Sequence, residues 1–520
     1  MIKKMLNSAD EILNIPAVDE KIKIEILNTP LYQCAPILEK ENIENQVRFA
    51  SPVSTNNWDT VTIVRAAMLN KSIAEKKTYP EAIDYTIEDD AANNTIYNVT
   101  GKFYPWEITT GGSGKNIWFK VCFSEGTFTY GDQKITLEEN TEVTISVALS
   151  YFPIPQQPAK NGDYKLSVDN SSNSPCVSIL SVDTKGSMQP ITQTVFSSVL
   201  SKWFNSADTL DKFQPLFATV VINNNGSEDF SWLKPTYMSY AYRDASDLNE
   251  ALFGVLCMTN DRDGREGVKQ LPLAAMRPDD DLMYLINREV FVKYNYLPGL
   301  VQAIPNTTAD NFTLGRDGLT VTANNLDLDE VSYAGSDYKP VLKEFSVSFD
   351  EERVSTSMQI DINISAGINV HSYVETEHTF NLSYNEKQEP IMVYENIGEP
   401  LVRNETVVSS GIVITEAIID VILAVATAAI SEAVEKVLQK IIIATVAAII
   451  AATIGIIIHL IIEEVITEGV LDKLPSVSPM VNAGISPVEW SFIEKNTFDI
   501  SDISYHGAFI FEGKVAIGHD

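Results

Sequence analysis

The stretch from Gly411 to Glu468 constrains the fold most, because it cannot be left facing water. Within it, Ile441 to Ile462 runs for 22 residues without a charged side chain, and 11 of those residues are isoleucine. Burying one isoleucine stabilises a fold by roughly 1.5–3 kcal/mol. Exposing all eleven would cost about 16–33 kcal/mol, more than the roughly 5–15 kcal/mol net stability of a typical domain. This stretch must therefore be covered.

The same stretch is predicted to be a long apolar helix. It lacks proline, Ser409 or Ser410 is a suitable N-cap residue, and Gly469 is a suitable C-cap residue. An unbroken helix over it would be about 85 Å long at roughly 1.5 Å per residue. That length exceeds a globular core.

Three kinds of surroundings could cover such a helix. A bilayer is one, since about 20 apolar residues span its hydrocarbon core. A helical bundle is the second, and a curved antiparallel sheet rolled around the helix is the third. The rest of the chain has few long helical patterns and many strand patterns. These patterns favour the wrapped helix.

The strand patterns come in two groups, each flanked by helical patterns. Residues 95–183 and 319–394 alternate polar with aromatic or β-branched residues. Helical patterns are predicted over 59–77, 191–204 and 288–304, the last one interrupted at Pro298. The order helix, strands, helix thus occurs about twice.

This organisation predicts two units after an extension. Residues 1–50 form an N-terminal extension of unknown role, residues 51–284 the first unit, and residues 285–520 the second unit with the long helix. The predicted fold class is α+β, an elongated architecture with long apolar helices wrapped by highly curved antiparallel sheets.

The net charge of −32 and the pI of about 4.5 argue against nucleic acid as a partner and disfavour adsorption to anionic lipid surfaces. Contact with a membrane stays open, but we expect no integral span. Binding to nucleic-acid phosphates requires lysine and arginine side chains, and anionic lipid surfaces attract basic segments. Asn7, Asp10 and Glu11 interrupt any apolar core of a Sec-type signal peptide. We expect a soluble protein made in the cytoplasm, with non-classical release as its route out of the cell.

No motif for catalysis or metal binding is complete. Residues 111–115 (GGSGK) lack the upstream glycine of a phosphate loop, and residues 260–264 (NDRDG) lack the glutamate of a calcium loop. A hairpin loop and a polar turn are the better interpretations, and Asp279–Asp281 is interpreted as a solvated turn. His371 and His378, seven residues apart, would face opposite sides of one strand. We therefore expect no enzyme, no cofactor and no metal.

Four motifs resemble one known family. They are NNWDTV around Trp58 and Asp59, FSWLKPTYMSYAY (Phe230 to Tyr242), GVLCM (Gly254 to Met258), and the tail from Leu474 to Phe492. They resemble the OrfX proteins and a forty-seven-kilodalton relative, accessory proteins encoded beside clostridial neurotoxin and insecticidal toxin genes. The resemblance implies the tubular lipid-binding (TULIP) fold, often with two such units, and covers about Asn56 to Gly518.

The resemblance also implies a function. It indicates a non-enzymatic protein that binds a lipid or another hydrophobic ligand and assists other proteins of a toxin cluster. Two alternatives stay open: a membrane-inserting or pore-forming toxin component that uses residues 411–468, and a structural scaffold in a toxin complex without a ligand.

The predicted ligand site lies on the bulky side of the long helix. Ala447, Ala451, Gly455 and His459 form a ridge of mostly small residues that could pack closely on a sheet. Space for an acyl chain would remain on the other sides. The predicted lipid-binding residues are Ile449, Ile456, Ile457 and His459.

Overall fold

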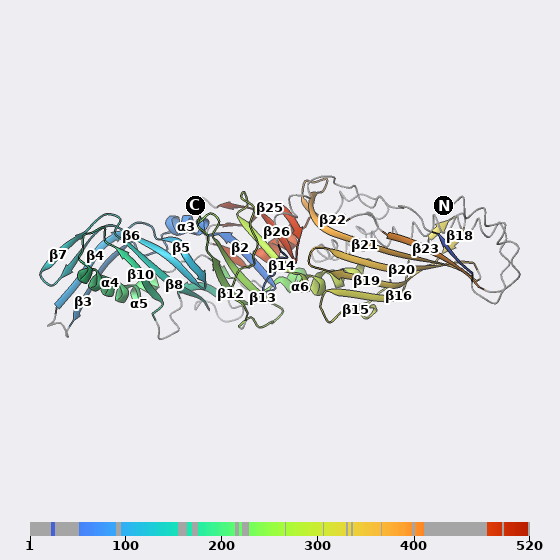
Figure 1. Cartoon of the computed structure of the whole chain (residues 1–520), viewed down its shortest axis with the longest axis horizontal. Coiled ribbons are helices and arrows are strands. Elements are labelled where there is room, and N and C mark those ends of the chain that lie inside the picture. Colours follow the sequence, from blue (N-terminus) through green and yellow to red (C-terminus); the bar gives the residue numbers. More distant parts are fainter. Residues whose placement is uncertain are drawn as a thin grey trace. The chain divides into compact units, whose positions relative to one another are not determined.

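The chain forms two compact units, seen in the computed structural model of Figure 1. Unit 1 comprises Met1–Pro52, Asn287–Met480 and Asp502–Ile510, and unit 2 comprises Val53–Ile286, Val481–Ser501 and Phe511–Asp520. The structure describes residues 22–26, 51–89, 95–153, 164–168, 175–213, 218–220, 228–265, 267–304, 306–328, 331–333, 336–365, 367–397, 401–409, 476–490 and 493–517. The long apolar stretch 411–468 lies outside these residues.

Unit 2 is dominated by strands. Its strands are β2 (Thr60–Arg65), β3 (Ala82–Asp89), β4 (Thr95–Phe103), β5 (Glu107–Gly114), β6 (Asn116–Tyr130), β7 (Gln133–Leu137), β8 (Glu142–Pro153), β9 (Tyr164–Val168), β10 (Val177–Asp183), β11 (Ala218–Val220), β12 (Pro235–Arg243), β13 (Leu252–Thr259), β14 (Leu282–Asn287) and β24 (Val488–Trp490). Its helices are α3 (Ala66–Lys76), α4 (Pro190–Phe204), α5 (Ala207–Lys212) and the short η2 (Glu228–Leu233). The helix α10 (Ser478–Ile485) and the strands β25 (Ile493–Tyr505) and β26 (Ala508–Ile517) divide between the two units.

These strands form one antiparallel sheet in the order β24-β11-β9-β8-β6-β5-β12-β13-β2-β14-β26-β25. Off this path, β10 pairs with β8, and β3, β4 and β7 extend the sheet from β6. Strands with one buried face alternate apolar and polar residues. Strand β6 is an example: every second side chain is fully buried, namely those of Ile117, Phe119, Val121 and Phe123, and the residues between them are not. By contrast β13 and β14 are buried at every position, and their sequences are correspondingly apolar throughout.

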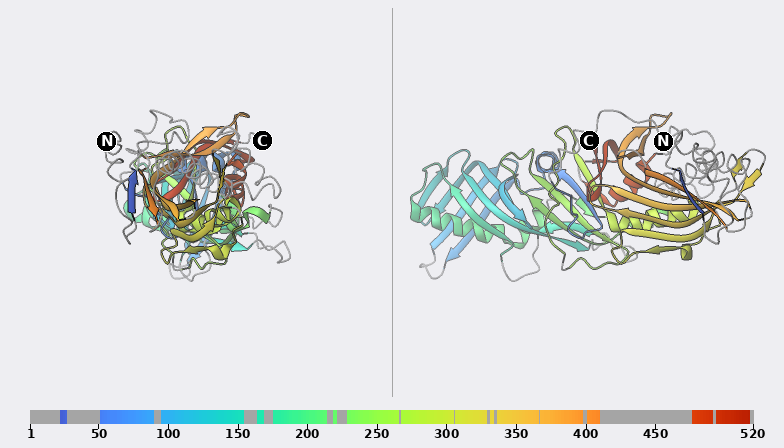
Figure 2. Two further views of the ribbon diagram at one scale, coloured as in Figure 1. Left: turned by 90° about the vertical axis from the view of Figure 1, so that its right-hand side faces the viewer. Right: turned by 45° about the vertical axis from the view of Figure 1, so that its right-hand side comes forward.

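Helix α4 lies along the sheet of unit 2, in green in the right view of Figure 2. Its buried face carries Phe196, Trp203 and Phe204. The Trp203 and Phe204 rings lie 6.4 and 5.7 Å from the ring of Trp106, measured between centroids. Aromatic burial against the sheet therefore holds this helix in place.

Unit 1 has a second antiparallel sheet. Its strands are β1 (Ile22–Ile26), β15 (Phe312–Leu314), β16 (Thr320–Asp327), β17 (Val331–Tyr333), β18 (Ser336–Tyr338), β19 (Pro340–Phe349), β20 (Val354–Ser365), β21 (Ile368–Tyr384), β22 (Pro390–Asn396) and β23 (Leu401–Val408). Its helical elements are α6 (Arg288–Phe291), the π-helical η3 (Val292–Tyr296), α7 (Leu297–Ala303) and the short η4 (Ala309–Asn311). The sheet order is β1-β23-β21-β20-β19-β16-β15, with β22 beside β21 and the pair β17–β18 separate.

Strand β21 shows the two faces of this sheet. Along it the residues alternate between buried and partly exposed, so that His378 is buried and His371 is half-buried. The two histidines therefore face opposite sides, as their spacing predicts. The aromatic core of this unit gathers around Phe349 and Phe509, whose neighbours include Phe291, Phe380 and Tyr505.

The predicted fold class is wrong: the described part of the chain contains no long apolar helix wrapped by a sheet. Its longest helix, α4, has 15 residues, and the run from Arg288 to Ala303 consists of three short pieces. One physical cause is visible in the predicted helix over residues 59–77. Residues Thr60–Arg65 are rich in β-branched side chains and form strand β2, and helix α3 begins only at Ala66.

Of the helices in the described ranges, none is long and apolar enough to cross a membrane.

Candidate functional site

The four predicted lipid-binding residues lie outside the described residues. Ile449, Ile456, Ile457 and His459 all belong to the stretch 411–468. Their role stays a prediction.

The first family motif forms a buried structural cluster. The Trp58 ring is fully buried and its Nε1 donates a hydrogen bond to the carbonyl oxygen of Val268 at 2.8 Å. The Lys269 ammonium lies 4.5 Å from the centre of the same ring, and Tyr237 stacks beside it at 6.1 Å. A tryptophan enclosed in this way holds the loop after β13 against the sheet.

Asp59, the next residue of the motif, is also fully buried. Its carboxylate accepts hydrogen bonds from the backbone N–H of Thr259 at 2.7 Å and from the Thr259 hydroxyl at 3.0 Å. The Arg262 guanidinium forms an ion pair with the same carboxylate. Burial raises the pKa of Asp59, while these hydrogen bonds and Arg262 act in the opposite direction.

Two of the three incomplete motifs are confirmed as a hairpin and a polar turn. Residues 111–114 form the irregular end of β5, and Lys115 is the turn to β6, with which β5 pairs as a hairpin. In the loop 260–264, Arg262 pairs with Asp59 and Asp263 with Arg265, so these side chains serve the turn itself. The predicted solvated turn at residues 279–281 holds for Asp279, which is exposed in a turn, but is wrong for Asp280. Asp280 is buried and accepts a hydrogen bond from Ser501 at 2.7 Å.

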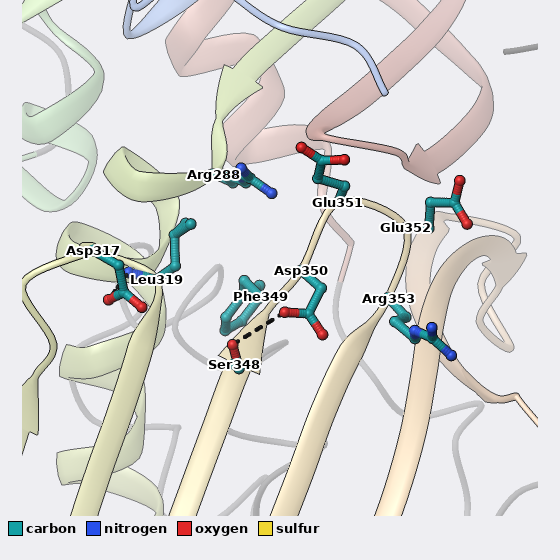
Figure 3. A pocket seen from close by; sticks show the side chains of 9 residues that line it. All are labelled: Arg288, Asp317, Leu319, Ser348, Phe349, Asp350, Glu351, Glu352 and Arg353. Atoms are coloured by element: carbon teal, nitrogen blue, oxygen red, sulfur yellow. Dashed lines mark hydrogen bonds between the residues drawn. The ribbon is translucent and has the colours of Figure 1, made fainter. Parts of the chain in front are cut away.

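Unit 1 contains an open hollow of about 430 Å³ at one end of its sheet (Figure 3). It lies around the turn between β19 and β20, the loop before β16, and the start of α6. Its lining residues are Arg288, Asp317, Leu319, Ser348, Phe349, Asp350, Glu351, Glu352 and Arg353. Four carboxylates and two guanidinium groups make this the candidate functional site.

Two of the four carboxylates are used by the local turns. Asp317 accepts hydrogen bonds from the backbone N–H groups of Leu319 and Thr320, at 3.0 and 3.1 Å, which lower the pKa of this carboxyl group. Asp350 accepts hydrogen bonds from the hydroxyls of Ser348 at 3.3 Å and Ser355 at 3.0 Å. These two side chains therefore stabilise the loops that form the hollow.

The other two carboxylates are open to solvent. Glu351 and Glu352 are exposed at the tip of the turn, and their side chains make no hydrogen bond or ion pair with the described part of the chain. Of the two arginines, Arg353 pairs with Glu377 at 2.6 Å. The hollow therefore favours a positively charged or hydrogen-bond-donating group.

Beneath the hollow lies Tyr505, which is almost completely buried. Its hydroxyl donates a hydrogen bond to the backbone carbonyl of Asp350 at 2.5 Å. Burial raises the pKa of Tyr505 strongly, although the Arg288 guanidinium beside it acts to lower it. The phenol stays neutral at physiological pH and anchors the turn on the aromatic core.

The lining of the hollow contains carboxylates but no histidine, cysteine or lysine. The Asp350 carboxylate beside Ser348 also accepts a hydrogen bond from Ser355 and so belongs to the turn. The sequence analysis missed this site. One signal was present, since the charged run Asp350–Arg353 separates two strand patterns, but Arg288 and Asp317 are distant in sequence and only the fold brings them there.

A histidine–aspartate pair occurs on the other face of the same sheet. The Nδ1 atom of His371 lies 2.6 Å from the Asp361 carboxylate, which also accepts a hydrogen bond from Gln359 at 2.8 Å. In the parts of the chain that are described, no hydroxyl or thiol bonds to His371, so the pair has no nucleophile to activate. The same parts contain no group of three or more metal-binding side chains.

Comparison with known proteins identifies relatives over most of the chain. The family described as OrfX-like, Protein OrfX2/OrfX3/P47, matches residues 55–513. Protein OrfX3 of Paraclostridium bifermentans is 28% identical over 389 residues, which are 68% of this chain and 77% of that protein. Protein OrfX3 of Clostridium botulinum (strain Kyoto / Type A2) is 27% identical over 391 residues, which are 67% of this chain and 77% of that protein.

Two solved structures share the fold at low sequence identity. The structure of P47 from Clostridium botulinum A2 has a TM-score of 0.62 and 16% identity, and covers 89% of this chain and 98% of its own. That of P47 from Clostridium botulinum E1 has a TM-score of 0.61 and 16% identity, and covers 89% of this chain and all of its own. Since the family matches nearly the whole chain, this protein belongs to the OrfX2/OrfX3/P47 family, as its four motifs indicate.

Proposed function

We propose that this protein is a non-enzymatic accessory protein that works by binding other proteins of a toxin cluster. The observation that carries the proposal is the family match over residues 55–513. The candidate site agrees with binding, because its hollow is open and lined by charged side chains. Two solvent-exposed carboxylates at its tip, Glu351 and Glu352, would attract a basic surface of a partner.

The experiment is co-purification of the tagged full-length protein with the proteins encoded beside its gene. One variant combines Glu351→Gln with Glu352→Gln, and the matched control combines Glu88→Gln with Glu138→Gln, which changes the charge equally on exposed residues of unit 2. We expect the wild type and the control to retain a partner and the hollow variant to retain about tenfold less. Recovery of no partner by any version would refute the accessory role. Equal retention by all three would place the contact elsewhere.

Binding of a lipid is a second candidate, favoured by polar groups left unpaired inside unit 1. Among the residues that the structure describes, no hydrogen-bond partner is found for the buried hydroxyls of Ser372 and Ser504 or for either polar atom of the Asn295 amide. Leaving such groups unpaired costs about 1–3 kcal/mol each. A ligand with an apolar tail and carbonyl or hydroxyl groups could pair with them.

The lipid proposal is tested by native mass spectrometry and lipid extraction of the purified protein. We expect co-purifying lipid in the wild type, and less of it in Ile449→Trp, which would fill the predicted ligand space. Absence of lipid in the wild type, together with no uptake of a fluorescent fatty acid, would leave protein binding as the remaining function.

A further inference from the structure

A second hollow, of about 510 Å³, lies between strand β10 and helix α4 in unit 2. Its lining residues are Pro175, Val177, Ser178, Ile179, Leu180, Ser181, Val182, Gln193, Thr194, Ser197, Ser198 and Ser201. None of these twelve side chains is charged, although the whole chain carries a net charge of −32. This groove is therefore a neutral strip, lined by hydroxyl groups, on an acidic protein.

One edge of β10 is open along this groove. Among the described strands β10 pairs only with β8, with Val177 opposite Val147 and Ile179 opposite Ile145. The backbone N–H and C=O of Val177 instead bond to the Asn205 side chain, at 3.1 and 2.8 Å, so they point away from β8. Residues two apart on a strand point their backbone groups the same way, so those of Ile179 also point to the open edge.

Side-chain amides occupy both ends of this edge but not its middle. Asn205 bonds to Val177 at one end, and Gln193 donates to the carbonyl oxygen of Val182 at 2.6 Å at the other. A bulge at Leu180 separates Ile179 from Ser181. In the described part of the chain, the N–H and C=O of Ile179 have no partner. The open edge between the two amides spans roughly 17 Å, the length of a five-residue strand.

Helix α4 supplies the opposite wall. Thr194, Ser197, Ser198 and Ser201 recur at helical spacing and face the groove. The hydroxyls of Thr194 and Ser197 bond to carbonyls of their own helix, while Ser198 is exposed and has no described partner. Short hydroxyl side chains leave room for a backbone beside the strand.

We propose that this groove binds an extended, uncharged polypeptide segment of a partner protein, which adds a strand to the edge of β10. The unpaired backbone groups of Ile179 supply the recognition chemistry for a peptide backbone. The neutral lining matches a segment without charge, since a carboxylate would meet the field of an acidic protein and a cation would meet no counter-charge in the groove. The inference rests on the proposed binding role only for the existence of a protein partner.

The test uses the full-length protein and a blocked peptide of alternating threonine, serine and valine, seven residues long. Its matched control is the same peptide with N-methyl groups at alternate residues, which removes backbone donors and keeps the side chains. We expect the first peptide to bind and the second to bind at least tenfold more weakly. Equal binding of both, or no binding of either, would overturn the proposal.

Variants of the protein locate the binding. Ile179→Pro removes the outward N–H without removing a bond to β8, and Ile179→Val keeps that N–H. Ser198→Trp fills the groove, and Ile191→Trp places the same ring on the same helix outside the lining, at a residue 78% exposed. We expect about tenfold weaker peptide binding for Ile179→Pro and Ser198→Trp, and little change for the two controls.

Two further outcomes distinguish this proposal from others. A concentration-dependent dimer that Ile179→Pro abolishes would assign the edge to a second copy of this chain and overturn the proposal. Peptide binding that persists when no toxin-cluster protein co-purifies would refute the accessory role but not the strand addition. If the peptide does not bind but toxin-cluster proteins still co-purify, the strand addition is refuted and the accessory role is not.

Discussion

At the scale of single residues, the buried polar group of Asp59 explains the structural role of the first family motif. Asp59 lies inside unit 2 and bonds to Thr259, which is 200 residues further along the chain. Replacing a buried, paired carboxylate by a side chain without hydrogen-bonding groups leaves its partners unpaired. The motif therefore joins the start of β2 to the end of β13, and its role is structural.

Asp59 predicts a pH dependence of stability. Because burial raises its pKa in the folded state, the folded protein keeps a proton that the unfolded chain, with a pKa of about 3.9, has released. The stabilisation by this group is full below the unfolded pKa and is lost as the pH rises through the folded pKa. We expect Asp59→Asn to remove this part of the pH dependence of the free energy of unfolding, measured by denaturant titration between pH 3.5 and pH 7. An unchanged slope in the variant would contradict the assignment.

Tyr240 predicts a local loss of stability. Its buried hydroxyl bridges two segments: it accepts from the Leu149 N–H at 2.7 Å and lies 2.5 Å from the Lys115 carbonyl oxygen. Tyr240→Phe leaves these backbone groups unpaired, so we expect the free energy of unfolding to fall by about 1.5–3 kcal/mol. The control is Tyr242→Phe on the same strand. In the described part of the chain its hydroxyl bonds to the exposed Asp244, so the loss should be under about 1 kcal/mol. Equal losses of unfolding free energy in the two variants would show that the buried Tyr240 hydroxyl contributes no more than the Tyr242 hydroxyl.

At the scale of elements, the helical run of unit 1 carries a widened turn. The π-helical piece Val292–Tyr296 stands immediately before Pro298, which has no N–H to donate to the carbonyl four residues earlier. A widened turn accommodates such a break. The buried side of this turn includes Asn295, whose amide has no hydrogen-bond partner within the described ranges.

This turn predicts a stabilising substitution. Leucine has the same number and branching of side-chain heavy atoms as asparagine, and it replaces two buried polar atoms that have no partner among the described residues. Asn295→Leu should therefore raise the free energy of unfolding by about 1–2 kcal/mol. Hydrogen exchange with mass spectrometry measures the change in amide protection in unit 1, with unit 2 as the internal reference. A loss of stability in the ligand-free protein would show that the amide is paired, and would weaken the lipid proposal.

At the scale of the whole molecule, the charge of −32 predicts which surfaces the protein avoids. Anionic bilayers repel acidic proteins, and this repulsion is screened as salt increases. We expect no co-sedimentation with phosphatidylserine vesicles at low salt, and the same result with neutral phosphatidylcholine vesicles. Binding to either that resists high salt and carbonate would instead support the membrane-inserting alternative for residues 411–468.

The sequence by itself determined the family, the strand-rich segments, the hairpin at residues 111–115 and the polar turn at residues 260–264. Each depends on short motifs or on alternation between neighbours, which are local properties of the chain. Only the tertiary structure decided that Thr60–Arg65 pairs as a strand instead of extending helix α3, because β13 and β14 on its two sides supply hydrogen bonds and burial. It also decided that Arg288 and Asp317 meet the turn 350–353, and that β10 has β8 as its one neighbour among the described strands. Contacts between residues so far apart depend on how whole sheets pack, and no local pattern encodes them.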